Sequence, residues 1–234
     1  MLPVAILAGG LASRMLPLTA MVPKALLDVA GQPFLFRQLR YLQGQGVDRV
    51  VLCTGYLGEQ IESEVGNGSR FGLRVDYSKD GPLPLGTGGA LRQALPLLDQ
   101  SFFVLYGDSF LPCDYRRVER AYESSGKPAI LTVFRNKNQW DKSNVLFRDG
   151  VLVEYNKRAP DPEMEHIDYG LSVLSSDLLE EYPLGQTLDL GDVYHDLSCQ
   201  GRLAGIEVAE KFYEIGSPSG LQEAESYFLK LEKN

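Results

Sequence analysis

The sequence predicts an α/β fold, built as a doubly wound and mostly parallel sheet that carries a small inserted β-rich part. Short apolar runs bounded by glycines alternate with segments of helical periodicity through residues 1–135. Residues 136–234 open instead on short strands around tight turns, and they close on one amphipathic helix. No repeat, linker or low-complexity stretch divides the chain, so we expect a single domain over residues 1–234.

The first part, residues 1–135, alternates strands with helices. Continuous apolar runs, which are typical of strands buried on both faces, occur at 4–7, 50–53 and 102–105. Residues 73–77 alternate between apolar and polar as a strand does, and a further strand is expected at 129–134. Apolar residues three and four positions apart predict helices at 34–42, 61–65, 90–98 and 115–122. In such sheets, ligands bind beyond the carboxyl ends of the strands. The loops that follow the strands are therefore where we expect a site.

The second part, residues 136–234, has a different character. Strands at 144–147 and 151–155 flank the turn Arg148-Asp149-Gly150, a pattern typical of a β-hairpin. A further strand is expected at 169–174, and helices are expected at 178–182 and 192–199. The C-terminal helix begins with Ser217 as N-cap and Pro218 at its first position, with one apolar face.

The composition excludes several classes of function. Lys and Arg number 23 and Asp and Glu number 31, so the formal net charge is −8, whereas nucleic-acid binding generally needs a basic face. No apolar run approaches the about 20 residues of a membrane helix. Cys53, Cys113 and Cys199 lie far apart, which indicates a reducing compartment and no disulfide framework. We therefore expect a cytoplasmic protein that binds neither nucleic acid nor membrane.

Paired glycines and two cations follow the first strand. The segment LAGGLASR spans residues 7–14, and Lys24 follows ten residues later. Backbone N–H groups at Gly9 and Gly10 can approach a phosphate closely because no Cβ intervenes, and Arg14 and Lys24 supply positive charge. Neither the GxxxxGK nor the GxGxxG pattern is present. The alternative is a tight strand-to-loop turn beside two surface cations.

Glycines also precede the helix expected at 90–98. The segment PLGTGGA spans residues 84–90 and contains Gly86, Thr87 and Gly88. Exposed N–H donors before a helix and the lack of side chains would let a flat ligand such as a base approach closely. The alternative is a flexible turn that simply starts the helix.

Two acidic residues occupy candidate metal positions. Asp108 follows the strand at 102–105, where a carboxylate is costly unless it faces a ligand or a metal. Glu214 lies between a short aromatic-rich strand and the C-terminal helix. Mg²⁺ commonly binds through one or two carboxylates together with substrate phosphates, so both residues are candidate ligands. The alternatives are a turn-initiating Asp and a strand-end charge, and His166 and His195 are interpreted as structural.

Taken in order, these segments resemble the sugar-1-phosphate nucleotidyltransferase family over nearly the whole chain. LAGGLASR with the later PK is similar to the family signature LxGGxGxR…PK, and PLGTGGAL is similar to its base-binding segment. YGDS and YEIGSP are similar to the segments that carry its two metal carboxylates. The resemblance implies a Rossmann-like sheet and a Mg²⁺-dependent transfer of a nucleotidyl group from a nucleoside triphosphate to a sugar 1-phosphate, with release of pyrophosphate.

The resemblance also implies a role for each candidate residue. Arg14, Lys24 and Asp108 would be catalytic, and Asp108 and Glu214 would hold Mg²⁺. The nucleotide would lie against residues of the first part: Leu7, Gly9, Gly10, Arg14, Lys24, Gly86, Thr87 and Gly88. The sugar phosphate would lie against residues of the second part: Asn144, Asn156, Lys157, Asp168 and Gly170.

Three residues depart from the family pattern, and Asn156 is the one that bears on the sugar. Ala12 replaces the third signature glycine, Glu214 replaces the usual Asp, and Asn156 stands where many members have Glu. PLGTGGAL is most similar to the guanylyltransferases for mannose or heptose 1-phosphate, which favours GTP. The chain is expected to contain the transferase core alone and to be a monomer or a homodimer.

Three alternatives stay open. The chain could be a catalytically weak homologue that binds nucleotide or sugar phosphate in a regulatory role. It could be a uridylyl- or cytidylyltransferase that acts on another phosphorylated acceptor. A metal-dependent glycosyltransferase is the third, although its expected DxD motif is lacking at Gly107-Asp108-Ser109.

Overall fold

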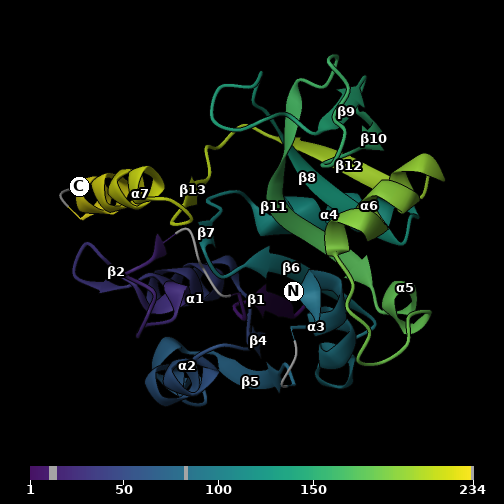
Figure 1. The fold of residues 1–234 in the computed structure, drawn as a ribbon. Helices are drawn as coiled ribbons and strands as arrows, with labels where there is room; N and C mark the ends of the chain where they lie inside the picture. The colour runs from purple at the N-terminus through teal and green to yellow at the C-terminus, as the bar shows by residue number, and fades with distance from the viewer. Residues whose placement is uncertain (11–14, 82–83, 233–234) are drawn as a thin grey trace.

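The computed structural model describes residues 1–10, 15–81 and 84–232. Within these residues the main sheet has nine strands in the order β10-β9-β11-β6-β1-β4-β5, while β8 pairs with β11 and with β12. Figure 1 shows the strands and helices of the first half of the chain in the lower part of the molecule and most of the second half above them. The predicted α/β class with a mainly parallel centre is confirmed.

The parallel region comes from the first part of the chain. β1 (Val4–Leu7) lies between β4 (Arg49–Thr54) and β6 (Ser101–Tyr106), and β5 (Arg74–Lys79) pairs with β4, all in parallel. These strands are apolar because both of their faces are covered. Leu7 is in register with Cys53 and Tyr106, so the carboxyl ends of three strands meet at one edge.

The antiparallel region comes from the second part. β11 (His166–Ser175) pairs with β6 on one side and with β8 (Ala129–Arg135) on the other. β9 (Val145–Arg148) and β10 (Val151–Tyr155) form the predicted hairpin. Its turn uses positive φ angles at Asp149 and Gly150, which suit those residue types.

Within the main sheet, the sequence analysis missed the strand β12 (Leu203–Val208). It pairs in parallel with β8 over its whole length. Gly205 interrupts its apolar run, and glycine inside a run weakens the strand signal. A Cβ at Gly205 would lie 2.8 Å from Leu152 Cβ and 2.9 Å from a ring carbon of Phe147. The glycine is therefore required by the hairpin that packs directly on it.

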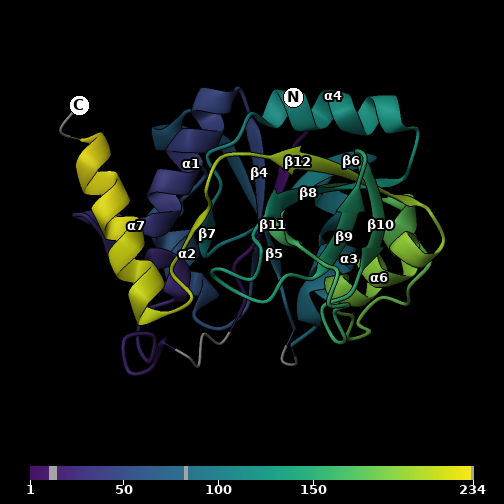
Figure 2. The same ribbon diagram turned by 90° about the horizontal axis from the view of Figure 1, so that it is seen from above.

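Helices cover both faces of the sheet, as Figure 2 shows. One face carries α1 (Phe34–Gln45), α2 (Gly58–Val65) and α4 (Tyr115–Ser125). Each helix contributes buried side chains to the same hydrophobic core, among them Leu39, Ile61 and Val118. The other face carries three further helices: α3 (Gly86–Ala94), α5 (Asp177–Glu180) and α6 (Leu190–Cys199).

The helix predicted at 90–98 begins and ends earlier. α3 starts at Gly86, which has a φ of +71°, and it ends at Ala94. A 3₁₀ helix, Leu95–Leu97, follows and contains Pro96. Proline has no N–H to donate within an α-helix and clashes with the preceding turn, so the regular helix stops before it.

α7 (Pro218–Leu231) returns to the first part of the chain. The Ser217 side chain accepts from Gly220 N–H as the predicted N-cap. Phe228 packs edge-on against Phe34 and Phe110 in a third hydrophobic cluster. This cluster brings the C-terminal helix beside α1 (Figure 2).

Short ladders complete the fold. β7 (Ser109–Phe110) pairs antiparallel with β13 (Tyr213–Glu214), and β2 (Asp28–Val29) pairs with β3 (Gln32–Pro33). The three cysteines are free. Among the helices that the structure describes, none has both the length and the apolar composition needed to cross a membrane.

Candidate functional site

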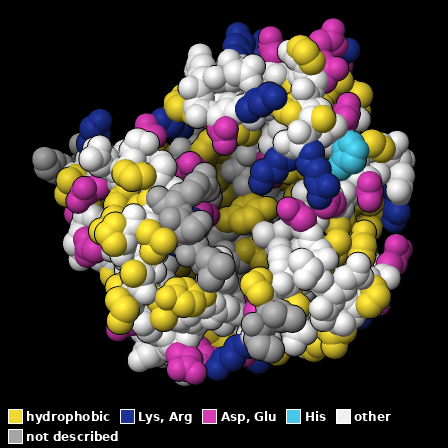
Figure 3. Space-filling model, in the orientation of Figure 1, with side chains coloured by type: hydrophobic (Ala, Val, Ile, Leu, Met, Phe, Trp, Pro, Cys, Tyr) yellow, Lys and Arg dark blue, Asp and Glu magenta, His cyan; other side chains and the backbone are white. Residues whose placement is uncertain are grey.

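A cavity of about 630 Å³ opens where the carboxyl ends of β1, β4 and β6 meet. Its lining comes from the loops after these strands, from the 3₁₀ helix Lys24–Leu26 and from the start of α3. Figure 3 shows a hollow at the centre of this face, with hydrophobic side chains at its base and charged side chains around it. This is the edge of the sheet where the sequence predicted a site.

The two glycines after β1 serve different purposes. A Cβ at Gly9 would lie 3.1 Å from Gly55 N and 3.3 Å from Asp80 Oδ2. The neighbouring loops therefore leave little room for a side chain at this position. Gly10 is exposed, and a Cβ there would meet no heavy atom of the described residues within 4 Å. Gly10 thus leaves open backbone at the cavity, whereas Gly9 lets two loops approach. Leu7 lines the same cavity, and Arg14 lies outside the described residues.

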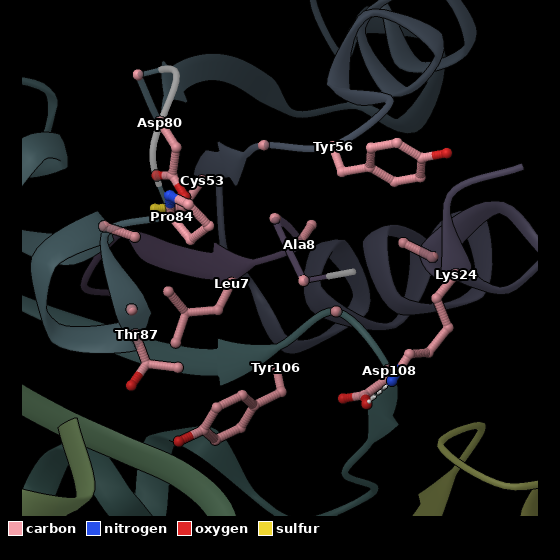
Figure 4. A pocket seen from close by; sticks show the side chains of 18 residues that line it. Leu7, Ala8, Lys24, Cys53, Tyr56, Asp80, Pro84, Thr87, Tyr106 and Asp108 are labelled. Carbon is pink, nitrogen blue, oxygen red and sulfur yellow. Dashed lines mark hydrogen bonds and ion pairs between the residues drawn. The ribbon is translucent and has the colours of Figure 1, made fainter. Parts of the chain in front are cut away.

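Lys24 and Asp108 form an ion pair on the cavity wall. Lys24 Nζ lies 2.7 Å from Asp108 Oδ2, and about a fifth of each side chain is accessible to solvent, 17 % and 26 %. Figure 4 shows the pair joined at one end of the cavity, with Asp80 and Pro84 at the other end. The structure therefore brings Lys24 and Asp108 together at one wall of the cavity.

Glu214 is brought to the same edge by backbone pairing. β13 places Glu214 opposite Ser109, and Ile215 N–H donates to Asp108 O over 2.9 Å. The donor set suits a hard divalent cation such as Mg²⁺, because carboxylate oxygens are its preferred protein ligands. In the structure the positive charge beside Asp108 is the ammonium of Lys24.

The protein offers few metal ligands of its own here. Across the described residues, no group of three or more His, Cys, Asp or Glu is arranged to hold a metal ion. Asp108 and Glu214 would therefore supply only part of a coordination shell. Phosphate oxygens and water would have to supply the rest, which is a common arrangement for Mg²⁺.

The start of α3 differs from the expectation of exposed N–H donors. Gly88 and Gly89 both donate to Leu188 O, over 2.8 and 3.2 Å. A Cβ at Gly86 would lie 2.5 Å from that same oxygen. The expectation is wrong for Gly88, because these glycines let the segment before α6 pack onto the helix start. Gly86 and Thr87 line the cavity, and Gly88 does not.

The predicted sugar-phosphate residues gather at one end of β11. Asn144 Oδ1 accepts from Asp168 N–H, and Asp168 Oδ1 accepts from Gly170 N–H, over 2.9 and 2.8 Å. Gly170 has a φ of +99°, which favours glycine. Asn156 N–H donates to Asn144 O, so the exit from β10 is tied to the same cluster.

Asp168 is the residue of this cluster whose carboxyl has a raised pKa. Burial raises the pKa of its carboxyl from 3.8 to about 6, while the Gly170 N–H and the charge of Lys157 act in the opposite direction. Burial also raises the pKa of the Tyr106 phenol, and the negative charge of Asp168 raises it further. Tyr106 lines the cavity, so the charge of Asp168 acts on a residue of the cavity wall.

Asp80 is a cavity residue that the sequence analysis did not identify. It follows β5 directly and lines the cavity near Gly9. Burial raises the pKa of its carboxyl, and a hydrogen bond from the backbone of Leu85 acts in the opposite direction. The carboxyl-end rule that located Gly9 and Asp108 could have located Asp80 too, because each residue follows a parallel strand.

Comparisons with known proteins agree with this geometry. A family model described as nucleotidyl transferase matches residues 4–144. The catalytic subunit beta of mannose-1-phosphate guanylyltransferase from Xenopus tropicalis is 28 % identical over 220 residues, which are 91 % of this chain and 61 % of that protein. The chain thus spans about three fifths of the length of this relative.

A second relative matches a shorter stretch of the chain with higher sequence identity. N-acetylmuramate alpha-1-phosphate uridylyltransferase from Neisseria meningitidis is 43 % identical over 111 residues, which are 47 % of this chain and 48 % of that protein. Among solved structures, HddC from Yersinia pseudotuberculosis matches with a TM-score of 0.81 and 26 % identity. That match covers 97 % of this chain and 100 % of HddC, and HddC was also crystallised with GMP-PN. The chain therefore belongs to the nucleotidyl transferase family.

Proposed function

We propose that the protein transfers a nucleotidyl group from a nucleoside triphosphate to a sugar 1-phosphate. The observation that carries the proposal is the Lys24–Asp108 pair, which stands between the cavity over β1 and the strand pair that holds Glu214. Transfer of a nucleotidyl group from one phosphate to another brings two anions together. A cationic side chain beside a candidate metal carboxylate can offset their repulsion. Family membership and the name of the Xenopus tropicalis relative support the same activity.

The proposed reaction needs no general base. A phosphate oxygen of the sugar 1-phosphate attacks the α-phosphorus in line, and pyrophosphate leaves. The attacking oxygen is already an anion, so the protein has to align two anions and offset their repulsion. Lys24 would contact the α-phosphate, Arg14 would contact the departing phosphates, and the open backbone at Gly10 would border the triphosphate.

Asp108 and Glu214 would hold Mg²⁺, whose bound charge would neutralise phosphate oxygens and help orient them. Lys24 then has two partners to choose between. In the structure its ammonium lies on Asp108. With Asp108 holding the metal, the Lys24 ammonium would be free to contact the phosphates.

We propose GTP as the preferred triphosphate. Asp80 lies at the opposite end of the cavity from Lys24 and Asp108 (Figure 4). A carboxylate can accept from the adjacent N1–H and N2 amino groups of guanine, a donor pair that uracil and cytosine lack. The GMP-PN complex of HddC supports this choice. The stretch that is 43 % identical to a uridylyltransferase supports UTP as the second candidate.

The acceptor would lie against the Asp168 cluster. Asp168 and Asn144 offer polar atoms suited to sugar hydroxyls, and Gly170 lets the strand turn beside them. Lys157 would bind the phosphate of the acceptor. Its positive charge acts on the Asp168 carboxyl, which indicates that it lies near this cluster. Asn156 is used within the chain, since its side chain accepts from Ala159 N–H and donates to Glu154.

A pyrophosphate-release screen tests the proposal. Purified protein and Mg²⁺ would be mixed with each of five triphosphates, GTP, UTP, CTP, ATP and dTTP, against a panel of sugar 1-phosphates. We expect release that needs both GTP and one particular sugar phosphate, and we expect Asp108→Ala to reduce kcat more than tenfold. Release with UTP alone would replace GTP by the second candidate. Triphosphate binding by thermal shift without turnover would instead support a regulatory homologue.

A further inference from the structure

A buried glutamine lies directly beneath the turn that presents Asp108. Gln38 belongs to α1 and is 3 % exposed. Its Nε2 donates to Tyr106 O over 2.9 Å and to Ser109 O over 2.6 Å. These two carbonyls flank Gly107 and Asp108, so one amide group spans the turn from below.

The contact uses the amide as a donor only. Nε2 has two hydrogens, and each has a carbonyl acceptor. Gln38 Oε1 is buried and has no hydrogen-bond partner among the described residues. A buried acceptor without a partner destabilises a fold, and an apolar side chain of similar shape would avoid that cost. What the glutamine adds at this position is therefore its pair of donors.

The packing of α1 does not depend on Gln38. Leu35, Leu39 and Leu42 from the same helix are buried in the core and hold α1 against the sheet. Removing the amide while keeping a side chain of equal length leaves these contacts in place. The turn, by contrast, would lose the two bonds that hold its flanks.

The rest of the turn is held from other directions. Gly107 N–H donates to Leu7 O, and Asp108 O accepts from Ile215 N–H, each over 2.9 Å. Gln38 adds the third attachment, on the side of α1. Ser109, one of its acceptors, is also the residue paired with Glu214. The amide thus touches the backbone on which both candidate metal carboxylates depend.

We propose that Gln38 is a positioning residue that orients the Asp108 carboxylate toward the metal. The inference rests on the proposed function, in which Asp108 holds that metal. Without the two donors, the carbonyls of Tyr106 and Ser109 turn away from α1 to find other partners, and the Asp108 side chain turns with them. Residues that orient a ligand from behind typically change metal affinity by about 10–100-fold when they are removed.

The test uses Gln38→Met, which keeps length and volume and removes both donors. Mn²⁺ affinity would be measured by calorimetry in the presence of an unreactive GTP analogue, together with thermal unfolding and kcat. We expect Mn²⁺ affinity to fall about tenfold or more. We expect the melting temperature to change little, and kcat to recover as Mn²⁺ is raised. Recovery by metal would not occur if the amide served stability alone.

Gln43→Met is the matched control, because Gln43 is an exposed glutamine of the same helix. It should leave Mn²⁺ affinity and kcat unchanged. Gln38→Leu is the second variant, because it also removes both donors and brings no charge into the core. It should weaken Mn²⁺ binding about as much as Gln38→Met, and it decides the question if Gln38→Met does not fold.

Asp108→Ala separates failure of this inference from failure of the proposed function. If Asp108→Ala loses Mn²⁺ affinity while folded Gln38→Met keeps the affinity of the unaltered chain, the role of Gln38 is refuted and the metal site stands. If Asp108→Ala itself binds Mn²⁺ normally, the assignment of Asp108 is refuted, and the inference about Gln38 falls with it.

Discussion

Substituting Asp168 by asparagine is expected to stabilise the fold above pH 6 and to weaken acceptor binding. The carboxyl of Asp168 is buried beside Tyr106, and its pKa rises from 3.8 to about 6. Asparagine keeps an oxygen that can accept from Gly170 N–H, and it carries no charge at any pH. The substitution therefore removes a buried charge while keeping the local hydrogen bond.

The magnitude follows from the two pKa values. One pH unit corresponds to about 1.4 kcal/mol, so a rise from 3.8 to about 6 costs up to about 3 kcal/mol once the group is ionised. Between about pH 4 and 6 the native chain holds a proton that the unfolded chain has released. The free energy of unfolding therefore falls as the pH rises through this window. Solvent reaches part of the side chain, so we expect a gain of about 1–3 kcal/mol for Asp168→Asn at pH 7.5.

Urea denaturation between pH 5 and 8 measures this effect. The gap between the two chains should be roughly half as large at pH 5 as at pH 7.5. Asp196→Asn, which removes an exposed carboxylate, controls for the change in net charge. At the same time, KM for the sugar phosphate should rise, because the acceptor loses a partner. Parallel pH profiles for the unaltered chain and Asp168→Asn, or a variant that is less stable at pH 7.5, would refute the reasoning.

Four further predictions concern the cavity over β1 and the start of α3 beside it. Lys24→Met should lower kcat/KM by about 10²–10³-fold, because the α-phosphate loses its cation, and steady-state pyrophosphate release measures the loss. Asp80→Asn should raise KM for GTP about tenfold and leave KM for UTP nearly unchanged, as one lost pairing is worth that much. Gly88→Ala should cost about 1–3 kcal/mol in urea denaturation, because its Cβ would lie 2.7 Å from Leu188 Cγ. Gly10→Ala should keep stability and raise KM for the triphosphate instead.

The parallel half of the fold could be predicted because its signals are local. Runs such as Val4–Leu7 are apolar throughout, and the rule for carboxyl ends then indicated Gly9, Gly10 and Asp108 without further information. The register of Leu7 with Tyr106 brings those loops together. Asp80 also follows a parallel strand, but an Asp before a glycine and a proline matches no known motif. The sequence alone therefore did not indicate it as a cavity residue.

The remaining features depend on contacts between distant residues. Gly88 N–H donates to the backbone oxygen of Leu188, a hundred residues away. No local sequence pattern predicts this hydrogen bond. Gly205 disrupts the apolar run of β12 because the hairpin packs on it. Gln38 lies on an ordinary amphipathic helix, and its partners at Tyr106 and Ser109 are known only once α1 has docked on the sheet.

Three energetically unfavourable groups lie around the first cavity. A further buried oxygen without a hydrogen-bond partner among the described residues, Tyr169 Oη, belongs to a ring that packs against Phe134 at the groove beside β12. Asp80 and Asp168 are carboxyls with raised pKa values, and Gln38 carries an unpartnered buried oxygen, all around the edge formed by β1, β4 and β6. The second groove, beside β12, has charged residues with partners: Arg135 pairs with Glu165, and Arg117 donates to Glu207 O. Stability alone would favour removing the first set and keeping the second. Because perturbed groups cluster where a site is arranged for a ligand, the first set supports the proposal that the substrates bind at the first cavity.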